Sequence, residues 1–279
     1  MDGCPYDLER LLGEGGMACV YLGVHRESGR EAAIKVPKGG PLGMPRFLRE
    51  IDVQQRLDHP HVMPILEIDP RRRWYAMPLA DYSLADLHKR NPFDWEQLRV
   101  ALSSLSGALM HGHVYGFVHR DVSPANLMRL GNGHWVLSDY GLVKASGLDE
   151  IKTAPRAKFG TPGFSAPEVH LNPASATAAA DAWSVGALAS WFTGIGVMAG
   201  DDSPLSGAFS PLIDGTMRID PASRWTMDQI AFSLNAGPVP VRVPVLAATT
   251  APEQCARCGA RAGHDASCRC LGCGFLDFD

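Results

Sequence analysis

The sequence predicts an α+β fold of two lobes, a small β-rich N-terminal lobe and a helical C-terminal lobe, with a small Zn-stabilised β module at the end of the chain. Strand patterns fill roughly the first 80 residues, helical periodicity follows from about Leu84, and five of the seven cysteines lie in the last 25 residues. A chain of 279 residues, 46% of them hydrophobic, can build one large core and an appendage. Its formal charge of −4 fits neither a polybasic nucleic-acid coat nor an acidic disordered tail.

The strand-rich part consists of short runs rich in Val, Ile, Leu and Tyr, separated by Gly, Pro and charged turns. These runs cover residues 20–24, 32–36 and 74–79. A helix is expected over about residues 45–57, because Phe47, Leu48, Ile51 and Leu57 partly share one face. The change from strands to helices also predicts a cleft between the two lobes.

The helical part is interrupted by a predicted hairpin, in which Gly131-Asn132-Gly133 joins the runs 127–130 and 134–138. Further on, residues 182–200 form 19 residues without a charge, which is long enough to cross a membrane. Serine, threonine and four glycines dilute the hydrophobicity of this run, so we interpret it as a buried core helix.

A glycine-rich turn lies between two strand-like stretches, in the sequence Leu12-Gly13-Glu14-Gly15-Gly16-Met17. Its glycines let backbone N–H groups approach phosphate oxygens, although a tight hairpin explains them equally well. Lys35 lies inside an apolar run, where an unpaired ammonium is costly. Glu50 on the following helix is a plausible partner, and the pair could hold a triphosphate; alternatively, Lys35 snorkels from an edge strand.

The central polar segments follow one another along the helical part of the chain. They are His119-Arg120-Asp121-Val122-Ser123-Pro124-Ala125-Asn126, Asp139-Tyr140-Gly141, Gly160-Thr161-Pro162, Ala166-Pro167-Glu168 and Asp181-Ala182-Trp183. Two carboxylates and an amide carbonyl, spaced across a loop and a hairpin turn, suit Mg²⁺ and phosphates. One carboxylate is left to accept a proton.

In this order the segments resemble the signature set of protein kinases over about residues 6–237, and the phrase LGxGGMxxVY is similar to the bacterial serine/threonine kinase branch. The resemblance implies a serine/threonine protein kinase that uses ATP and acts in bacterial signalling, including autophosphorylation. It implies that Lys35 binds the α/β-phosphates and pairs with Glu50, that Asp121 accepts the proton of the substrate hydroxyl, and that Asn126 and Asp139 hold Mg²⁺ or Mn²⁺.

The same resemblance implies a nucleotide site. Its expected residues are Leu12, Gly13, Gly15, Gly16, Val20, Ala33, Lys35, Met77, Pro78, Ala80, Ser83 and Met128. Met77 would be the gatekeeper of the adenine pocket, Pro78 and Ala80 would offer a carbonyl and an N–H to the base, and Ser83 would contact the ribose.

Some positions depart from the family pattern. Ser123 stands where these kinases usually have a lysine that contacts the transferring phosphate, and a serine brings no charge. Losing one such contact can cost about 10²–10³ in rate, which motivates the alternative of a nucleotide-binding pseudokinase scaffold. All five core polar groups are nevertheless present, and the Gly-Thr-Pro and Ala-Pro-Glu segments argue against a small-molecule kinase of related fold. Tyr140 replaces the usual phenylalanine, which requires a partner for its hydroxyl.

The resemblance also implies several structural contacts in the C-terminal lobe. Arg224 would pair with Glu168, Asp181 would cap the catalytic loop, and Thr161 would pack near Asp121. Between residues 200 and 221 there is room for only one short helix, where these kinases usually have two.

Arg120 lies directly before Asp121, and the resemblance to kinases with this arrangement implies that a phosphorylated activation segment neutralises the arginine. The candidate phosphosites are Thr153 and Ser146, with Lys144 as a second cation beside the phosphate.

The C-terminal cysteines have the spacing of a metal site. Cys255 and Cys258 form one Cys-x-x-Cys pair, Cys270 and Cys273 form another, and eleven residues separate the two pairs. Four thiolates would close a structural Zn²⁺ site, which we favour over a redox dithiol. The spare donors are His264 and Cys268, and Cys268 could replace Cys270 as a ligand.

The chain therefore divides into a kinase domain at 1–237, a Pro-rich linker at 238–254 and a zinc-ribbon-like module at 255–279. In the module, the positive charges of the arginines are balanced by the negative charges of the aspartates, which disfavours nucleic acid as a partner. One expected partner is a protein substrate. Bacterial kinases with such a tail resemble those found beside a PP2C-type phosphatase and a von Willebrand factor A-type protein, so both of these proteins are also expected partners. The acidic N-terminus lacks a signal-peptide pattern, so we expect a cytoplasmic protein without a membrane span.

Overall fold

The computed structural model describes residues 4–39, 43–91, 94–145, 160–194 and 204–235, all within the unit Met1–Val239. Several predicted features lie outside the described residues. They are the linker, the phosphosite candidates Ser146 and Thr153, the zinc candidates Cys255, Cys258, Cys270 and Cys273, and the spare donors His264 and Cys268.

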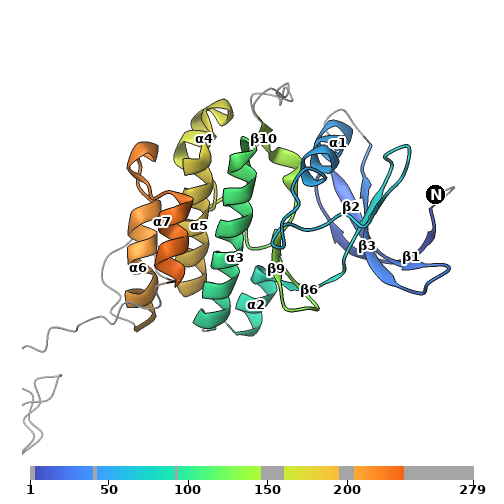
Figure 1. Cartoon of the computed structure of the whole chain (residues 1–279), viewed down its shortest axis with the longest axis horizontal. Helices are drawn as coiled ribbons and strands as arrows, with labels where there is room; N and C mark the ends of the chain where they lie inside the picture. Colours follow the sequence, from blue (N-terminus) through green and yellow to red (C-terminus); the bar gives the residue numbers. More distant parts are fainter. Residues whose placement is uncertain (1–3, 40–42, 92–93, 146–159, 195–203, 236–279) are drawn as a thin grey trace, which may run out of the picture. The chain divides into compact units, whose positions relative to one another are not determined.

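Five strands form an antiparallel N-terminal sheet in the order β1-β2-β3-β5-β4 (Figure 1). Their bounds are β1 Tyr6–Glu14, β2 Ala18–His25, β3 Glu31–Pro37, β4 Glu67–Ile68 and β5 Tyr75–Met77. Side chains alternate across β3, so that Ile34 packs with Trp74 on one face and Ala33 packs with Met77 on the other. Lys35 lies on the same face of β3 as Ala33, because side chains alternate along a strand. There it lines the cleft and bonds Glu50 of helix α1.

Helix α1, Gly43–Gln54, packs against β3 and against the short 3-10 helix η1, Tyr140–Leu142. Phe47, Glu50, Ile51 and Gln54 are buried at the three- and four-residue spacing of one helix face. The predicted helix at 45–57 is confirmed, but it begins and ends earlier than expected. The packing of α1 therefore carries a glutamate into the interior beside β3.

A second, three-stranded sheet has the order β6-β8-β9, and a short pair joins β7 to β10. The bounds are β6 Ala80–Ser83, β7 Phe117–Val118, β8 Leu127–Leu130, β9 Trp135–Leu137 and β10 Lys144–Ala145. The antiparallel pairing of β8 with β9 confirms the predicted hairpin. This hairpin carries the chain from the catalytic-loop segment to Asp139.

The remaining chain is helical, and Figure 1 shows α3, α5, α6 and α7 side by side. The helices are α2 Leu84–Arg90, α3 Trp95–Val114, α4 Pro167–Leu171, α5 Ala178–Thr193, α6 Pro204–Thr216 and α7 Met227–Asn235, with 3-10 turns η2 Pro173–Ser175 and η3 Pro221–Ser223. Helix α3 contacts both α5 and α7, and fully buried Leu102, Leu105, Leu188 and Ile230 lie in the core that they share.

Helix α5 is buried on most sides, as expected for the apolar run at 182–200. It ends sooner than that run, at Thr193, because Gly194 adopts a left-handed φ of 70° that closes the helix. No helix in the described part of the chain combines the length and apolarity that a membrane span requires. Within the described residues between α5 and η3 there is a single helix, α6, which agrees with the predicted shortening.

Candidate active site

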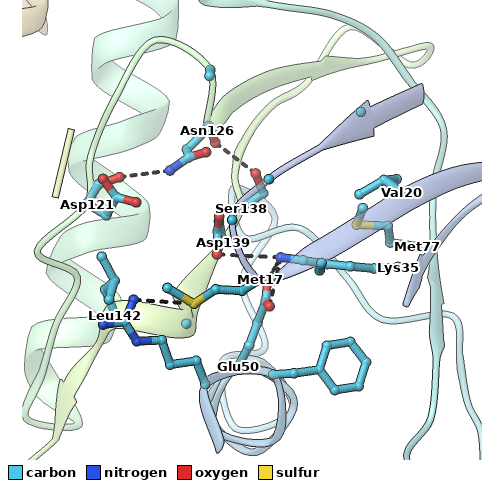
Figure 2. Close-up of a pocket in the computed structure, with 18 of the residues that line it drawn as sticks. Met17, Val20, Lys35, Glu50, Met77, Asp121, Asn126, Ser138, Asp139 and Leu142 are labelled. Carbon is cyan, nitrogen blue, oxygen red and sulfur yellow. Dashed lines mark hydrogen bonds and ion pairs between the residues drawn. The ribbon is translucent and has the colours of Figure 1, made fainter. Parts of the chain in front are cut away.

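A cleft of about 430 Å³ brings the predicted polar residues together (Figure 2). Its walls come from the glycine-rich turn, β3, α1, the catalytic-loop segment and η1. Lys35, Glu50, Asp121, Asn126 and Asp139 all line it. Five residues spread over more than a hundred positions thus converge on one space, as the sequence predicted.

Lys35 and Glu50 form a buried ion pair in this cleft. The Nζ of Lys35 donates to both carboxylate oxygens of Glu50, at 2.6 and 2.8 Å, and lies 3.4 Å from Oδ1 of Asp139. Burial disfavours the ammonium, but the carboxylates of Glu50 and Asp139 outweigh it and raise the pKa of Lys35 above its ordinary value. The lysine is therefore charged. It does not snorkel from an edge strand, because β3 lies between β2 and β5 in the sheet.

The sequence reasoning missed Tyr75 as a support of this pair. Its hydroxyl donates to Oε1 of Glu50 at 2.9 Å, and its ring stacks on Phe47 with the centroids 5.4 Å apart. Tyr75 fixes the glutamate in the orientation that meets Lys35. The sequence alone could not predict this role, because it depends on the pairing of β3 with β5, which places Tyr75 opposite Lys35.

Asp181 at the start of α5 holds the catalytic loop, as predicted. Its buried carboxylate accepts the backbone N–H groups of His119 and Arg120, both at 2.9 Å, and lies 2.8 Å from Nε2 of His113. Arg120 has a φ of 66°, a conformation that non-glycine residues rarely adopt and that these bonds sustain. The loop is thereby fixed directly before Asp121.

Asp121 lies at the cleft with its carboxylate held by Thr161, whose Oγ1 donates to Oδ1 at 2.8 Å. Burial raises the pKa of Asp121 to about 6, against the lowering effect of the Thr161 hydroxyl. A carboxylate with such a pKa is ionised at neutral pH yet basic enough to take a proton, which suits a general base. The predicted contact of Thr161 with Asp121 is confirmed.

Asn126 and Asp139 lie at the end of the hairpin, where they could hold a metal. The Nδ2 of Asn126 donates to the backbone oxygen of Asp121 at 2.9 Å, and Lys35 and His119 lower the pKa of Asp139 in spite of its burial. An amide and an ionised carboxylate are hard oxygen donors that fit Mg²⁺, which usually takes few protein ligands and the rest from phosphates and water. Consistent with this sparse donor set, no three His, Cys, Asp or Glu side chains gather as a metal site in the described residues.

The expected nucleotide residues separate into two groups. Gly13, Gly15, Gly16, Val20, Lys35, Met77 and Met128 line the cleft, whereas Leu12, Ala33, Pro78, Ala80 and Ser83 do not. Leu12, Val20, Ala80 and Met128 nevertheless pack against one buried cluster that contains Ala33 and Met77. An apolar wall of this kind fits the faces of an adenine ring.

Ser83 is the N-cap of α2, a role that the sequence reasoning missed. Its Oγ donates to Oδ2 of Asp86 at 2.7 Å and accepts from the N–H of Asp86 at 3.2 Å. The spacing of Ser83 and Asp86 is a capping box, so the sequence did carry this signal.

The two cations expected to receive a phosphate already have backbone partners. The Nε and Nη1 of Arg120 donate to the carbonyls of Leu142 and Pro173, at 2.7 and 3.1 Å. The Nζ of Lys144 donates to the carbonyls of Ala174 and Ala176. These contacts tie β10 and the catalytic loop to η2 without any phosphate.

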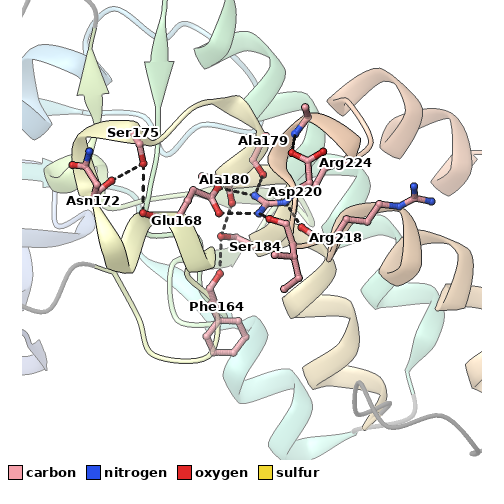
Figure 3. Close-up of polar contacts among 12 residues, drawn as sticks. Phe164, Glu168, Asn172, Ser175, Ala179, Ala180, Ser184, Arg218, Asp220 and Arg224 are labelled. Carbon is pink, nitrogen blue, oxygen red and sulfur yellow. Dashed lines mark hydrogen bonds and ion pairs between the residues drawn. The ribbon is translucent and has the colours of Figure 1, made fainter.

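The predicted pair of Arg224 and Glu168 is confirmed (Figure 3). Two parallel hydrogen bonds of 2.7 and 2.8 Å join the guanidinium to the carboxylate, and the arginine side chain is completely buried. Arg224 also donates to the carbonyls of Ala179, Arg218 and Ile219. The pair locks α4 to the turn after η3.

Tyr140 differs from the expectation for its hydroxyl. The ring packs edge-on against His119, 4.8 Å between centroids, but the buried hydroxyl has no hydrogen-bond partner among the described residues. The aromatic replacement is therefore accommodated by packing alone.

The sequence reasoning also missed Arg46 and Met17, which line the cleft beside the predicted groups. Arg46 lies on α1 one turn before Glu50 and is buried. Nothing in the local sequence distinguishes it from the exposed arginines of the chain, because its burial depends on how α1 packs.

Comparison with known proteins identifies the family of the chain. The family described as "Protein kinase domain" matches residues 6–203, so the chain belongs to that family. CBL-interacting protein kinase 4 of rice is 39% identical over 195 residues, which cover 66% of this chain and 43% of the relative. Serine/threonine-protein kinase PknK of Mycobacterium tuberculosis is 36% identical over 190 residues, 65% of this chain and 17% of the relative.

DNA damage-responsive serine/threonine-protein kinase RqkA of Deinococcus radiodurans is 36% identical over 176 residues, 58% of this chain and 26% of the relative. The matched segments thus span less than half the length of each of these relatives.

Proposed function

We propose that the chain is a serine/threonine protein kinase that transfers the γ-phosphate of ATP to protein hydroxyls, itself included. The observation that carries this proposal is the convergence of Lys35, Glu50, Asp121, Asn126 and Asp139 on one cleft, with the Lys35–Glu50 pair formed. Kinase relatives from bacteria and plants support it.

In the proposed reaction Asp121 orients the acceptor hydroxyl and takes its proton as the oxygen attacks the γ-phosphorus. The bond between that phosphorus and the β,γ-bridging oxygen breaks, and ADP leaves. Lys35, held by Glu50, binds the α- and β-phosphates, and Asn126 and Asp139 would hold Mg²⁺ or Mn²⁺, which would neutralise phosphate charge. The protein acts mainly by positioning and by electrostatics.

Transfer of radiolabel from ATP to the chain or to a generic protein tests the proposal. We expect Asp121→Asn to abolish transfer while ATP binding persists, because the amide cannot accept the proton. The matched control is Asp58→Asn, an exposed aspartate outside the cleft, which should transfer like the wild type. Equal labelling of wild type and Asp121→Asn would contradict catalysis and leave the pseudokinase alternative, which the buried Ser123 motivates.

The nucleotide residues are part of the same proposal. Leu12, Val20, Ala33, Met77 and Met128 would enclose the adenine, and Pro78 and Ala80 would offer their backbone groups to its edge. For Ser83 the capping bonds to Asp86 compete with a ribose contact, so Ser83→Ala is expected to affect α2 more than nucleotide affinity.

For the C-terminal segment, the proposal is a structural zinc module at 255–279 after a linker at 238–254. Support comes from the spacing of Cys255, Cys258, Cys270 and Cys273. Elemental analysis should find one zinc per chain, and a Cys258→Ser/Cys270→Ser variant should lose it. Retention of zinc by that variant would refute this ligand set and point to Cys268 or His264 as replacements.

The biological setting is proposed from the family resemblance alone. A signalling role in the cytoplasm, with a protein substrate, a PP2C-type phosphatase and a von Willebrand factor A-type protein as partners, fits a kinase with a docking module. Phosphosite mapping of the recombinant protein tests Thr153 and Ser146 as sites of autophosphorylation. Unmodified Thr153 and Ser146 in an active preparation would exclude them.

A further inference from the structure

The proposed kinase reaction has a charge deficit at the transferring phosphate. Ser123, at the position where related kinases carry a lysine, is 2% exposed and does not line the cleft. The cleft is lined by four carboxylates, those of Glu14, Glu50, Asp121 and Asp139, and among its described lining residues the cations are Lys35 and Arg46. Lys35 is bonded to both oxygens of Glu50, and the proposed reaction assigns it to the α- and β-phosphates. Arg46 has no role in that reaction so far.

Arg46 has the place that such a cation needs. It precedes Glu50 by four residues on α1, and so lies one turn away on the same face. Gly141 lies against both residues, because a Cβ built on it would lie 3.4 Å from Oδ1 of Asp139, 3.6 Å from the carbonyl oxygen of Arg46 and 3.8 Å from Cβ of Arg46. Burial lowers the pKa of Arg46, whereas the charges of Asp121 and Asp139 raise it, so the guanidinium feels both carboxylates.

The guanidinium also reaches the glycine-rich turn. Its Nη1 donates to Sδ of Met17 at 3.3 Å, and Figure 2 marks this bond at the sulfur of Met17. A thioether sulfur is a weak acceptor, whereas a phosphate oxygen forms a charge-assisted bond of about twice the strength of a neutral one. A phosphate beneath the turn would therefore take this N–H from Met17.

We propose that Arg46 binds the terminal phosphate of ATP and supplies the charge that Ser123 does not, an inference that rests on the proposed kinase function. Lys35 then serves the inner phosphates and Arg46 the outer one. A planar guanidinium can offer two N–H groups to one phosphate. Arg46 could therefore bind the terminal phosphate from helix α1.

The experiment compares nucleotide binding with turnover in dephosphorylated full-length protein, so that no phosphorylated side chain of the chain can be the anion bound by Arg46. Binding of Mg²⁺-ADP and of a Mg²⁺-bound non-hydrolysable ATP analogue is measured by calorimetry for wild type, Arg46→Gln, Arg46→Lys and Arg56→Gln. Arg56 follows α1 and is exposed, so Arg56→Gln removes the same charge outside the cleft.

We expect Arg46→Gln to weaken the ATP analogue about tenfold relative to ADP, the size of one lost charge-assisted bond, and to lower kcat by about 10²-fold. Arg46→Lys should recover part of both, and Arg56→Gln should match wild type. An unchanged ratio of analogue to ADP affinity in Arg46→Gln, or an equal loss for both nucleotides, would overturn the inference. If the wild type transfers no phosphate, the kinase proposal fails, whereas the affinity ratio still decides the role of Arg46.

Discussion

At the scale of single residues, two opposing effects set the basicity of Asp121. Burial raises its pKa to about 6, while the Thr161 hydroxyl and backbone contacts pull the pKa down. As the pH falls, Asp121 is therefore protonated at a higher pH than an ordinary aspartate, and it can then no longer accept a proton. The acid limb of the activity should therefore lie near pH 6.

This balance predicts the effect of Thr161→Val on the pH profile of kcat/KM. Without the hydroxyl that stabilises the ionised form, the pKa of Asp121 rises further, and the acid limb moves toward neutral pH. A pH series of initial rates measures it. Thr193→Val, which removes a hydroxyl that donates to the carbonyls of Ala189 and Ser190 within α5, is the control and should leave the limb in place. A limb that stays put in Thr161→Val would contradict this assignment.

Two buried tyrosines predict opposite responses to loss of the hydroxyl. In Tyr140→Phe the change removes a buried group without a partner in the described residues, so the free energy of unfolding should stay the same or rise by up to about 1 kcal/mol. In Tyr75→Phe it breaks the bond to charged Glu50 and should cost about 1.5–3 kcal/mol. Urea denaturation measures both. Equal effects of the two substitutions would show that the partner makes no difference.

At the scale of elements, the fold ties its helices together through buried polar pairs as well as apolar packing. Arg224 and Glu168 link the turn after η3 to α4, and Arg224 also bonds the carbonyl of Ala179 at the start of α5 (Figure 3). The arginine side chain has no exposed area, so these partners take the place of water around its charge. Such a pair is costly to break from one side.

Arg224→Leu is therefore predicted to destabilise the chain by about 3–5 kcal/mol, because it leaves the glutamate facing an apolar side chain. The matched control is Arg26→Leu, which removes an arginine that also bonds a carboxylate, that of Asp7, but with both side chains more than half exposed. That change should cost much less than Arg224→Leu, because water already solvates both charges. Thermal or urea unfolding compares the two, and similar losses would contradict the role assigned to burial.

The elements also show how far sequence patterns reach. Alternation and turn residues placed β2, β3, α1 and the β8–β9 hairpin, because their signals are local. The two-residue strands β7 and β10 have no pattern of their own and exist through pairing. The end of α5 was predicted too late, because composition alone does not show that Gly194 adopts a left-handed conformation.

The same distinction holds within the site. Lys35, Glu50, Asp121, Asn126 and Asp139 were predictable because their spacing along the chain is the family pattern. Arg46 and Tyr75 were not, because each acquires its role from the face that it presents after α1 and β5 pack. Ser83 had a readable capping signal in Asp86 that a functional interpretation obscured.

At the scale of the whole molecule, the last described helix, α7, completes the hydrophobic core around α3. Helix α7 packs on α3 with Ile230 and Leu234 buried, and it ends at Asn235. The predicted boundary at residue 237 lies directly after it. A chain that stops there retains all the described residues of the cleft and of the core that surrounds α3.

We therefore predict that a chain truncated after Gly237 folds, binds Mg²⁺-ATP and unfolds within about 2 °C of the full chain, a shift of less than about 1 kcal/mol. The zinc found with the full chain should be missing from it, because the four candidate cysteines are removed. Differential scanning calorimetry and elemental analysis test the two halves of the prediction. A cysteine variant of the full chain, Cys258→Ser/Cys270→Ser, is the control for loss of metal without loss of length. If the truncated chain aggregates while this variant stays folded and binds nucleotide, residues after 237 belong to the kinase core and the boundary is wrong, since loss of the metal alone would then not explain the failure.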